Sequence, residues 1–215
     1  MRIIAAPPTA DLSLTEAVDC LRRGGLVAYP TDTLYGLGAA AGDDGAVRRL
    51  FQAKRRPLDN PLPILVGSLK AAESVAQMGP SLALRLASHF WPGGLTLVLP
   101  RELGFHSLAL AGGDTVAVRV PNHRVPLALI RELGQPLTGT SANVSGGAAP
   151  LTAAAVAEQL GERVDVIIDG GRCPGGMEST VLDLTGESPR VLREGAISRA
   201  ELESVIGSEL VEVEE

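Results

Sequence analysis

The stretch Leu26-Val27-Ala28-Tyr29-Pro30-Thr31-Asp32-Thr33-Leu34-Tyr35-Gly36 decides the fold of this chain. Its apolar part, residues 26–29, predicts a buried strand, and hydroxyl, carboxylate and backbone groups follow that strand directly. Because α/β domains hold their ligands just beyond strand ends, the stretch predicts an α/β fold with a binding site there. In that interpretation Thr31 and Thr33 contact the ligand and two glycines allow its close approach. An ordinary turn is the competing interpretation.

Three further stretches place cations, hydroxyls or bare backbone directly after an apolar run. They are Lys54-Arg55-Arg56-Pro57 with Asn60-Pro61, Val118-Arg119-Val120-Pro121, and Thr140-Ser141-Ala142-Asn143. Arginine presents a planar fork to phosphate and carboxylate, and lysine presents a point charge. Together the four stretches predict a site for a polyanionic small molecule.

Helices and strands alternate along the rest of the chain. Capping boxes at Ser13/Glu16 and Ser198/Glu201 and caps at Ser68, Ser81 and Thr152 predict helix starts. Asp44 predicts the start of another helix, and Pro126 near a first turn predicts one that runs to Leu133. Apolar runs predict strands over 26–29, 64–66, 95–99, 115–120, 137–140, 164–168, 180–184 and 190–192. The close strand pair over 180–192 favours a mixed sheet, so the predicted fold is a twisted mixed β-sheet flanked by helices with a concave basic cleft.

The net charge of −6 conceals a local excess of cations. Residues 201–215 hold six Glu and no Lys or Arg, which leaves 19 acidic and 19 basic residues elsewhere. Residues 46–58 contain five cations and no acid, and the local field governs ligand capture. Aromatic residues make up only 3%, which offers few platforms for stacking nucleic-acid bases. We expect a single domain over 1–200 and a helix end with an acidic tail over 201–215.

Cysteine usage and apolar run lengths indicate a cytoplasmic protein without a membrane partner. Cys20 and Cys173 lie far apart and show no CxxC spacing, which is typical of a reduced compartment. The first apolar run is too short for a signal peptide, and no run approaches the ~20 residues of a membrane span.

Several familiar sites are excluded by their missing motifs. No Gly-Lys pair or GxGxxG is present, and the three His and two Cys lack zinc spacing, so we expect no protein metal site. Residues 139–143 lack the second Gly of a nucleophile elbow, and all three His precede Ser141. Catalysis would then rest on positioning and charge neutralisation, as in phosphoryl and nucleotidyl transfer.

The cations also allow structural interpretations. Lys54 and Arg56 close a predicted helix and could complement its dipole, although Pro57 fixes a rigid exit that favours ligand binding. Arg119 lies within an apolar strand and needs an anionic partner, either an internal acid or a ligand. It shares one strand face with Thr115 and Ala117.

The ordered series of motifs resembles the YrdC/TsaC family of threonylcarbamoyl-AMP synthases from about residue 13 to residue 197. The matching segments are 29–36, 54–57 with 60–62, 90–96, 116–121, 140–146, 179–183 and 193–195. The resemblance implies that L-threonine, bicarbonate (or CO2) and ATP give threonylcarbamoyladenylate and diphosphate. The product serves N6-threonylcarbamoyladenosine modification of tRNA, with tRNA or the tRNA-modifying transferase complex as a further partner.

The resemblance also implies residue roles. Threonine is held by Thr33, Arg119, Ser179 and the Gly139 backbone. ATP is held by Lys54, Arg56, Asn60, Thr115, Ser141, Asn143, Ala149 and Arg193. Lys54 and Arg56 act in catalysis by neutralising charge, and magnesium is bound mainly through ATP.

Two positions depart from the family pattern. Leu65 stands where many members have a threonine-contacting His, and Ala149 stands where a Ser is common. Longer members carry an additional C-terminal domain, and we expect none here. Two alternatives stay open at this stage: an RNA-binding module without catalysis, and a carbamoyltransferase using carbamoyl phosphate and ATP.

Overall fold

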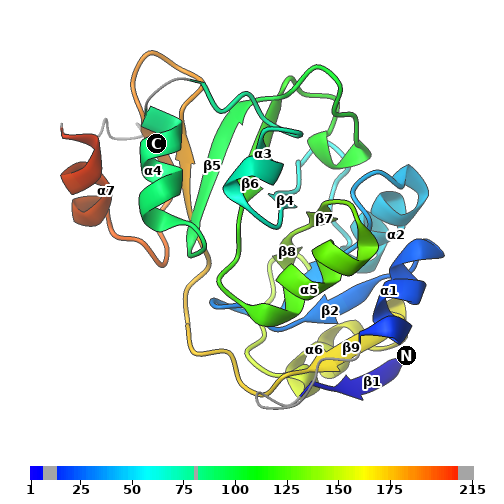
Figure 1. Cartoon of the computed structure of the whole chain (residues 1–215). Coiled ribbons are helices and arrows are strands. Elements are labelled where there is room, and N and C mark those ends of the chain that lie inside the picture. The colour runs from blue at the N-terminus through cyan, green and yellow to red at the C-terminus, as the bar shows by residue number, and fades with distance from the viewer. Residues whose placement is uncertain (7–13, 80–81, 208–215) are drawn as a thin grey trace.

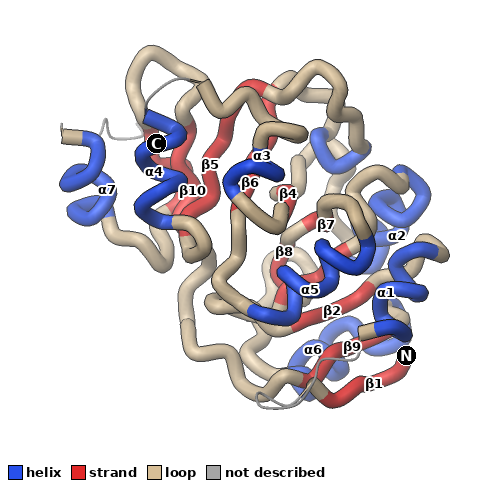
Figure 2. The backbone as a smooth tube through the Cα atoms, in the orientation of Figure 1, coloured by secondary structure: helices blue, strands red, loops and turns tan. Residues whose placement is uncertain are grey.

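Two mixed β-sheets with helices packed against them form the computed structural model, which describes residues 1–6, 14–79 and 82–207 (Figures 1 and 2). The first sheet has the strand order β1-β9-β2-β3-β8. Strands β1, β9 and β2 are parallel to one another, β3 is antiparallel to β2, and β8 is antiparallel to β3. Its strands are Arg2–Ala5 (β1), Val166–Asp169 (β9), Val27–Tyr29 (β2), Gly36–Gly38 (β3) and Thr140–Ser141 (β8). The predicted α/β fold with mixed pairing is confirmed, in two sheets.

The second sheet has the order β11-β10-β5-β6-β4-β7 and alternates antiparallel and parallel pairs. Its strands are Arg190–Arg193 (β11), Thr180–Asp183 (β10), Leu95–Pro100 (β5), Thr115–Arg119 (β6), Ile64–Leu65 (β4) and Leu137–Thr138 (β7). The predicted close strand pair over 180–192 is therefore present, as the antiparallel pair of β10 and β11.

Gly139 carries the chain from one sheet to the other. The prediction of a single strand over 137–140 is wrong, because β7 belongs to the second sheet and β8 to the first. The amide of Gly139 donates to the carbonyl of Pro63 at 2.7 Å. A Cβ at this position would lie 2.5 Å from Cγ of Leu65, so only glycine fits the crossing.

The predicted helix starts are confirmed wherever they fall on described residues, including the start at Asp44 and Pro126 in the first turn of the helix over 124–133. Asp43, Ser68 and Thr152 accept from backbone amides three residues on, and Ser198 with Glu201 forms the predicted capping box. Ser13 and Ser81 lie outside the described residues. The α-helices are Thr15–Arg22 (α1), Asp44–Lys54 (α2), Leu69–Ala72 (α3), Leu82–Phe90 (α4), Arg124–Leu133 (α5), Ala153–Leu160 (α6) and Arg199–Ile206 (α7).

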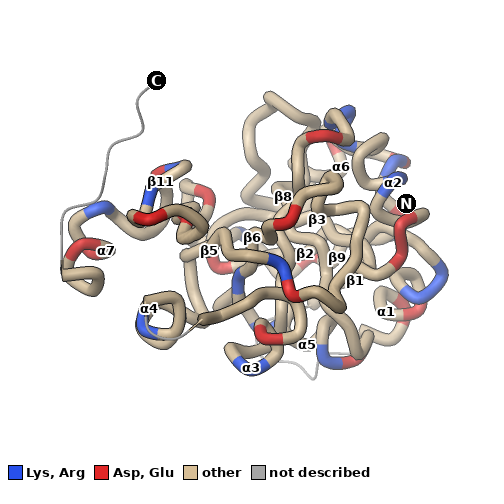
Figure 3. Tube along the Cα trace, turned by 90° about the horizontal axis from the view of Figure 1, so that it is seen from above, with Lys and Arg blue, Asp and Glu red and all other residues tan. Residues whose placement is uncertain are grey.

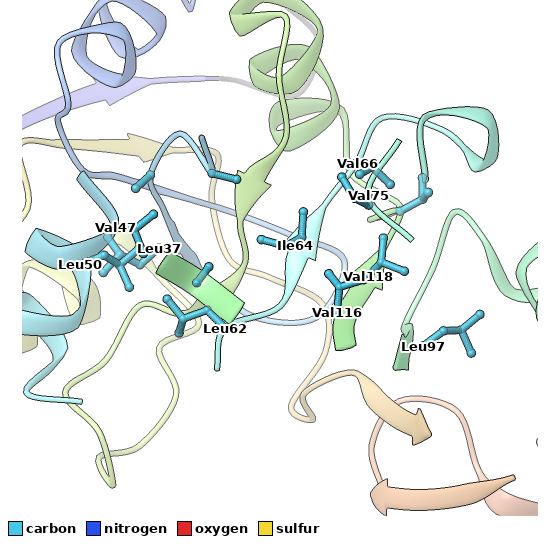
Figure 4. Close-up of a cluster of buried hydrophobic side chains, with 14 of the residues drawn as sticks. Leu37, Val47, Leu50, Leu62, Ile64, Val66, Val75, Leu97, Val116 and Val118 are labelled. Atoms are coloured by element: carbon cyan, nitrogen blue, oxygen red, sulfur yellow. The ribbon is translucent and has the colours of Figure 1, made fainter. Parts of the chain in front are cut away.

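Strand β2, in the middle of the first sheet, is buried on both faces. Val27 and Tyr29 join one apolar cluster together with residues of α1 and α5, whereas Ala28 joins another together with residues of α2 and α6. The strict alternation along β2 produces this division. The larger cluster continues beneath the second sheet, where residues such as Ile64, Val118 and Leu97 meet (Figure 4). One continuous core therefore holds the two sheets in fixed relation.

Strand β3 has glycines where the ring of Tyr29 packs against its backbone. A Cβ at Gly36 or Gly38 would lie 2.8 Å from the ring of Tyr29, which is fully buried. The hydroxyl of Tyr29 donates to the carbonyl of Thr138 at 3.0 Å and ties the first sheet to β7. The structure thus gives these two glycines a packing role, and Gly36 also lines the pocket described below, so the expected close approach of a ligand there stays a prediction.

The five cations of residues 46–58 do not form one surface. Arg49 donates to Asp165 at 3.0 Å and to the carbonyl of Gly24 at 2.6 Å, and Arg48 and Arg55 are exposed. Figure 3 shows both signs of charge distributed along the whole trace. Only Lys54 and Arg56 of this run line the pocket described below. Across the described ranges, no helix is long and apolar enough to cross a membrane.

Candidate functional site

A pocket of about 730 Å³ opens between the two sheets and is lined by residues of both. It brings together side chains far apart in the sequence, from Tyr29 to Arg193. The predicted site residues that line it are Thr33, Lys54, Arg56, Asn60, Thr115, Arg119, Gly139, Ser141, Asn143, Ser179 and Arg193. Ala149 is not among the lining residues. The sequence prediction that these scattered groups converge on one cavity is therefore confirmed, whereas their roles stay predictions.

Strand β6 presents one face to the pocket. Thr115, Ala117 and Arg119 line the cavity, and the intervening Val116 and Val118 are buried in the core. This is the two-residue period expected of a strand between a site and a core.

Arg119 is held by three fixed contacts. Its Nη2 donates to Oδ1 of Asp32 at 2.7 Å, its Nε to the carbonyl of Gly93 at 2.8 Å, and its Nη1 to Oγ1 of Thr33 at 3.3 Å. Burial lowers the pKa of the guanidinium, and Asp32 opposes that shift. The anionic partner that the sequence left open is thus internal, and the remaining N–H groups of the fork are free to meet a ligand.

The turn after β2 is stabilised by the hydroxyl of Thr31. Oγ1 of Thr31 donates to the carbonyl of Leu34 at 2.7 Å and accepts from the amides of Thr33 and Leu34. Thr31 therefore stabilises the turn, and it also lines the pocket, so its predicted ligand contact stays a prediction. Thr33 differs, because its hydroxyl contacts Arg119 at the pocket wall.

Lys54 enters the pocket from the last turn of α2 and is buried. Its ammonium donates to the carbonyls of Ser141 and of Asn143, the latter at 2.8 Å. Burial, with a smaller contribution from nearby Arg56, lowers the pKa of Lys54 to about 8, and Glu178 opposes the shift. Within the described residues no carboxylate forms an ion pair with this ammonium, so an anionic ligand would supply its missing counter-charge.

Arg56 follows α2 through Arg55, which adopts the left-handed conformation with φ of 53°. Its Nε donates to the carbonyl of Asn60 at 2.9 Å, and its Nη2 donates to the carbonyl of Pro61 at 2.8 Å. The turn thus folds Arg56 back against Asn60, and the helix ends before Pro57, as the sequence predicts. Burial lowers the pKa of Arg56, and Glu178 opposes the shift.

Arg193 and Ser179 meet on the opposite wall. Nε and Nη2 of Arg193 donate to the carbonyl of Ser179 at 3.1 and 2.9 Å, and Nη1 donates to Glu178. The hydroxyl of Ser179 lies 2.8 Å from that of Thr96, which is buried on β5. These contacts fix the hydroxyl of Ser179 at the pocket surface.

Asn143 closes the loop after β8. Its Nδ2 donates to the carbonyls of Val144 and Gly147 at 3.0 and 2.6 Å, which fixes the orientation of the amide. Its buried Oδ1 has no hydrogen-bond partner among the described residues. Asn143 therefore stabilises the turn after β8 and also lines the pocket.

Among the lining residues that the sequence analysis did not predict, Thr96 and Glu178 contact predicted site residues directly. Thr96 alternates with buried leucines on β5, and that period could have placed it beside Ser179. Glu178 precedes Ser179 directly, but nothing local showed that it would face Arg193. No group of three or more His, Cys, Asp or Glu able to hold a metal occurs within the described part of the chain.

Comparisons with known proteins agree with this geometry. The family model that bears the names Sua5, YciO and YrdC, described as "Telomere recombination", matches residues 19–195. A threonylcarbamoyl-AMP synthase of Pyrococcus abyssi is 48% identical over 191 residues, covering 89% of this chain and 56% of the relative. A threonylcarbamoyl-AMP synthase of Bacillus subtilis is 42% identical over 200 residues, covering 93% and 58%.

A solved structure is similar over the same region. The crystal structure of P. abyssi Sua5 complexed with L-threonine superposes with a TM-score of 0.93 at 44% identity, covering 99% of this chain and 63% of that one. The chain thus spans a little over half the length of the curated relatives it matches first. On the family match, the shared fold and the convergence of the motif residues on one pocket, this chain belongs to the Sua5/YciO/YrdC family.

Proposed function

We propose that the pocket binds ATP and L-threonine side by side and forms L-threonylcarbamoyladenylate and diphosphate, with bicarbonate or CO2 as the third substrate. The observation that carries this proposal is the convergence of two differently built groups of side chains on one cavity. Relatives at 48% and 42% identity are named threonylcarbamoyl-AMP synthase, and the similar Sua5 structure contains L-threonine.

The amino-acid end is formed around Arg119. Its guanidinium is fixed by Asp32 and Gly93 and offers its remaining N–H groups to a carboxylate. Thr33, Ser179 and the backbone of Gly139 line the same end and supply short polar groups. This combination suits a small zwitterion with a hydroxyl, such as threonine.

The nucleotide end carries the other cations. Lys54, Arg56 and Arg193 would neutralise the phosphates, and four polar residues would position the nucleotide: Asn60, Thr115, Ser141 and Asn143. Lys54 and Arg56 are the proposed catalytic pair, because they would stabilise charge that develops on the reacting phosphorus and on the leaving diphosphate. Ala149 would contribute at most a backbone contact from outside the lining.

The chemistry fits this set of residues. The amine of threonine adds to CO2 and loses a proton to give a carbamate, whose oxygen then attacks the α-phosphorus as the bond to diphosphate breaks. An anionic nucleophile requires no strong base at that step, and what it requires is neutralisation of repelling charges. The lining residues are rich in such cations and hydroxyls.

Magnesium would be held mainly by the triphosphate. The two carboxylates among the described lining residues are already engaged: Glu178 contacts Arg193, and Asp183 accepts from Thr185 at 2.7 Å. Magnesium would supply further charge neutralisation on phosphate oxygens, for which it needs few protein ligands. The adenylate would pass to a tRNA-modifying transferase, a partner that we also propose.

The direct test is release of diphosphate from ATP by the purified chain. The expected result is release that requires threonine, bicarbonate and magnesium together, and that is slower with serine. A folded preparation that releases no diphosphate at any magnesium or bicarbonate concentration would refute the proposed function.

A further inference from the structure

The carboxylate of Glu178 lies beside the cations of the nucleotide end. Oε2 of Glu178 accepts from Nη1 of Arg193, and both side chains are about two-fifths exposed at the pocket wall, 36% and 42% respectively. The other two nitrogens of the guanidinium donate to the carbonyl of Ser179. Arg193 is thus anchored to the backbone on one side and paired with a partly exposed carboxylate on the other.

Glu178 also acts on the neighbouring cations. Its negative charge raises the pKa of both Arg56 and Lys54, against the stronger effect of their burial. Arg193 has the opposite influence on Arg56. The carboxylate therefore lies within the electrostatic reach of three cations that line one cavity, where a phosphate group would otherwise be attracted.

We propose that the carboxylate of Glu178 competes with the phosphate groups of the ligand for pairing with Arg193. It pairs with Arg193 when no anion is bound, gives way when ATP enters, and returns as diphosphate leaves, so that product release is faster than three unpaired cations would allow. This inference rests on the proposed function in naming ATP and diphosphate as the anions. It makes Glu178 a positioning residue that acts through Arg193.

The second lining carboxylate provides a matched control. Asp183 also lines the pocket and also contacts an arginine, Arg190, at 3.4 Å. Its Oδ1, however, accepts from the amide and hydroxyl of Thr185 at 2.9 and 2.7 Å, within its own turn. Removing its charge therefore leaves Arg193 paired with Glu178.

The test is titration of Glu178→Gln, Asp183→Asn and the wild-type chain with inorganic diphosphate by calorimetry, with and without magnesium. Glu178→Gln should bind diphosphate about three- to tenfold more tightly, the size expected from removing one half-exposed competing charge. Its affinity should fall more steeply with added salt, because one more protein cation then pairs with the ligand. Asp183→Asn should stay within about twofold of wild type.

Equal or weaker diphosphate binding by Glu178→Gln would overturn the inference, and a loss confined to the magnesium titration would identify Glu178 as a metal ligand instead. Thermal melting establishes that each variant is folded, and Glu178→Asp, with its shorter reach to Arg193, should give an intermediate gain if Glu178→Gln does not fold. Because the titration needs no turnover, a chain that binds diphosphate but releases none from ATP would refute the proposed function and leave this test intact.

Discussion

The two ends of the pocket each present an arginine paired with a carboxylate, and the pairs differ in burial. Side chains of Arg119 and Asp32 are 8% and 16% exposed, whereas those of Arg193 and Glu178 are 42% and 36% exposed. A buried pair is part of the fold, since neither charge can stand alone there. A half-exposed pair costs little to open. The amino-acid end is therefore rigid before any ligand binds. At the nucleotide end, Arg193 can exchange its carboxylate partner for a ligand.

The largest expected effect comes from breaking the buried pair. Arg119→Met leaves the carboxylate of Asp32 without its cation and should lower the free energy of unfolding by about 3–5 kcal/mol. Arg193→Met should lower it by about 1 kcal/mol or less, because Glu178 then turns to water. Urea denaturation of both variants measures the difference. Equal losses would show that the two pairs do not differ as described.

A smaller effect is expected from one added methyl group at each end. Gly139→Ala places its Cβ 2.5 Å from Cγ of Leu65 and should cost about 1–3 kcal/mol of stability by overpacking. Gly176→Ala, in the segment before Glu178, meets no atom within 4 Å and should change stability by about 0.5 kcal/mol or less. The Leu65→Ala background should recover part of the loss in Gly139→Ala. If it recovers none, backbone strain and not the Leu65 contact explains the cost.

The smallest of the three effects concerns pH. Burial lowers the pKa of Lys54 to about 8, so its charge is present below that pH and is lost as pH rises through it. Phosphate groups are fully ionised well above their second pKa of about 6, so the ligand's charge stays constant over this range. ATP affinity should therefore fall by about tenfold between pH 7.5 and 9.5, equivalent to about 1.4 kcal/mol.

Lys54→Met is the control for that profile. Its ATP affinity should be weak and nearly independent of pH in calorimetry over the same range, whereas Arg193→Met should retain the wild-type slope. A wild-type profile that is flat from pH 7.5 to 9.5 would show that Lys54 keeps its proton throughout or does not contact the nucleotide.

The features that were predicted correctly from the sequence are set by interactions between residues close together along the chain. The capping box at Ser198 and Glu201, the helix start at Asp44 and the alternation of β6 are all local patterns. Strands β1 and β3 were missed for the opposite reason. β3 is Gly-Leu-Gly, a poor strand former, and it exists because the ring of Tyr29 packs over it.

The residues that line the site were largely predicted from the sequence, but the contacts that those residues make with one another were not. The motif series identified eleven residues that line one pocket. The partner of Arg119 stayed open, because Asp32 is 87 positions away and equally plausible as a turn residue. Glu178 was not recognised, since only the antiparallel pairing of β10 with β11 brings it to Arg193. Long-range pairings of this kind follow from topology, which no local pattern contains.

The measurement that tests the central claim most directly is calorimetric binding of ATP and of L-threonine to Arg56→Ala and Arg119→Ala. If the two ends of one pocket hold the two substrates, Arg56→Ala should chiefly weaken ATP and Arg119→Ala should chiefly weaken threonine, each by about tenfold or more, the range for losing a charge-assisted contact. Folded variants that lose both ligands equally would contradict the division of the pocket on which this account depends.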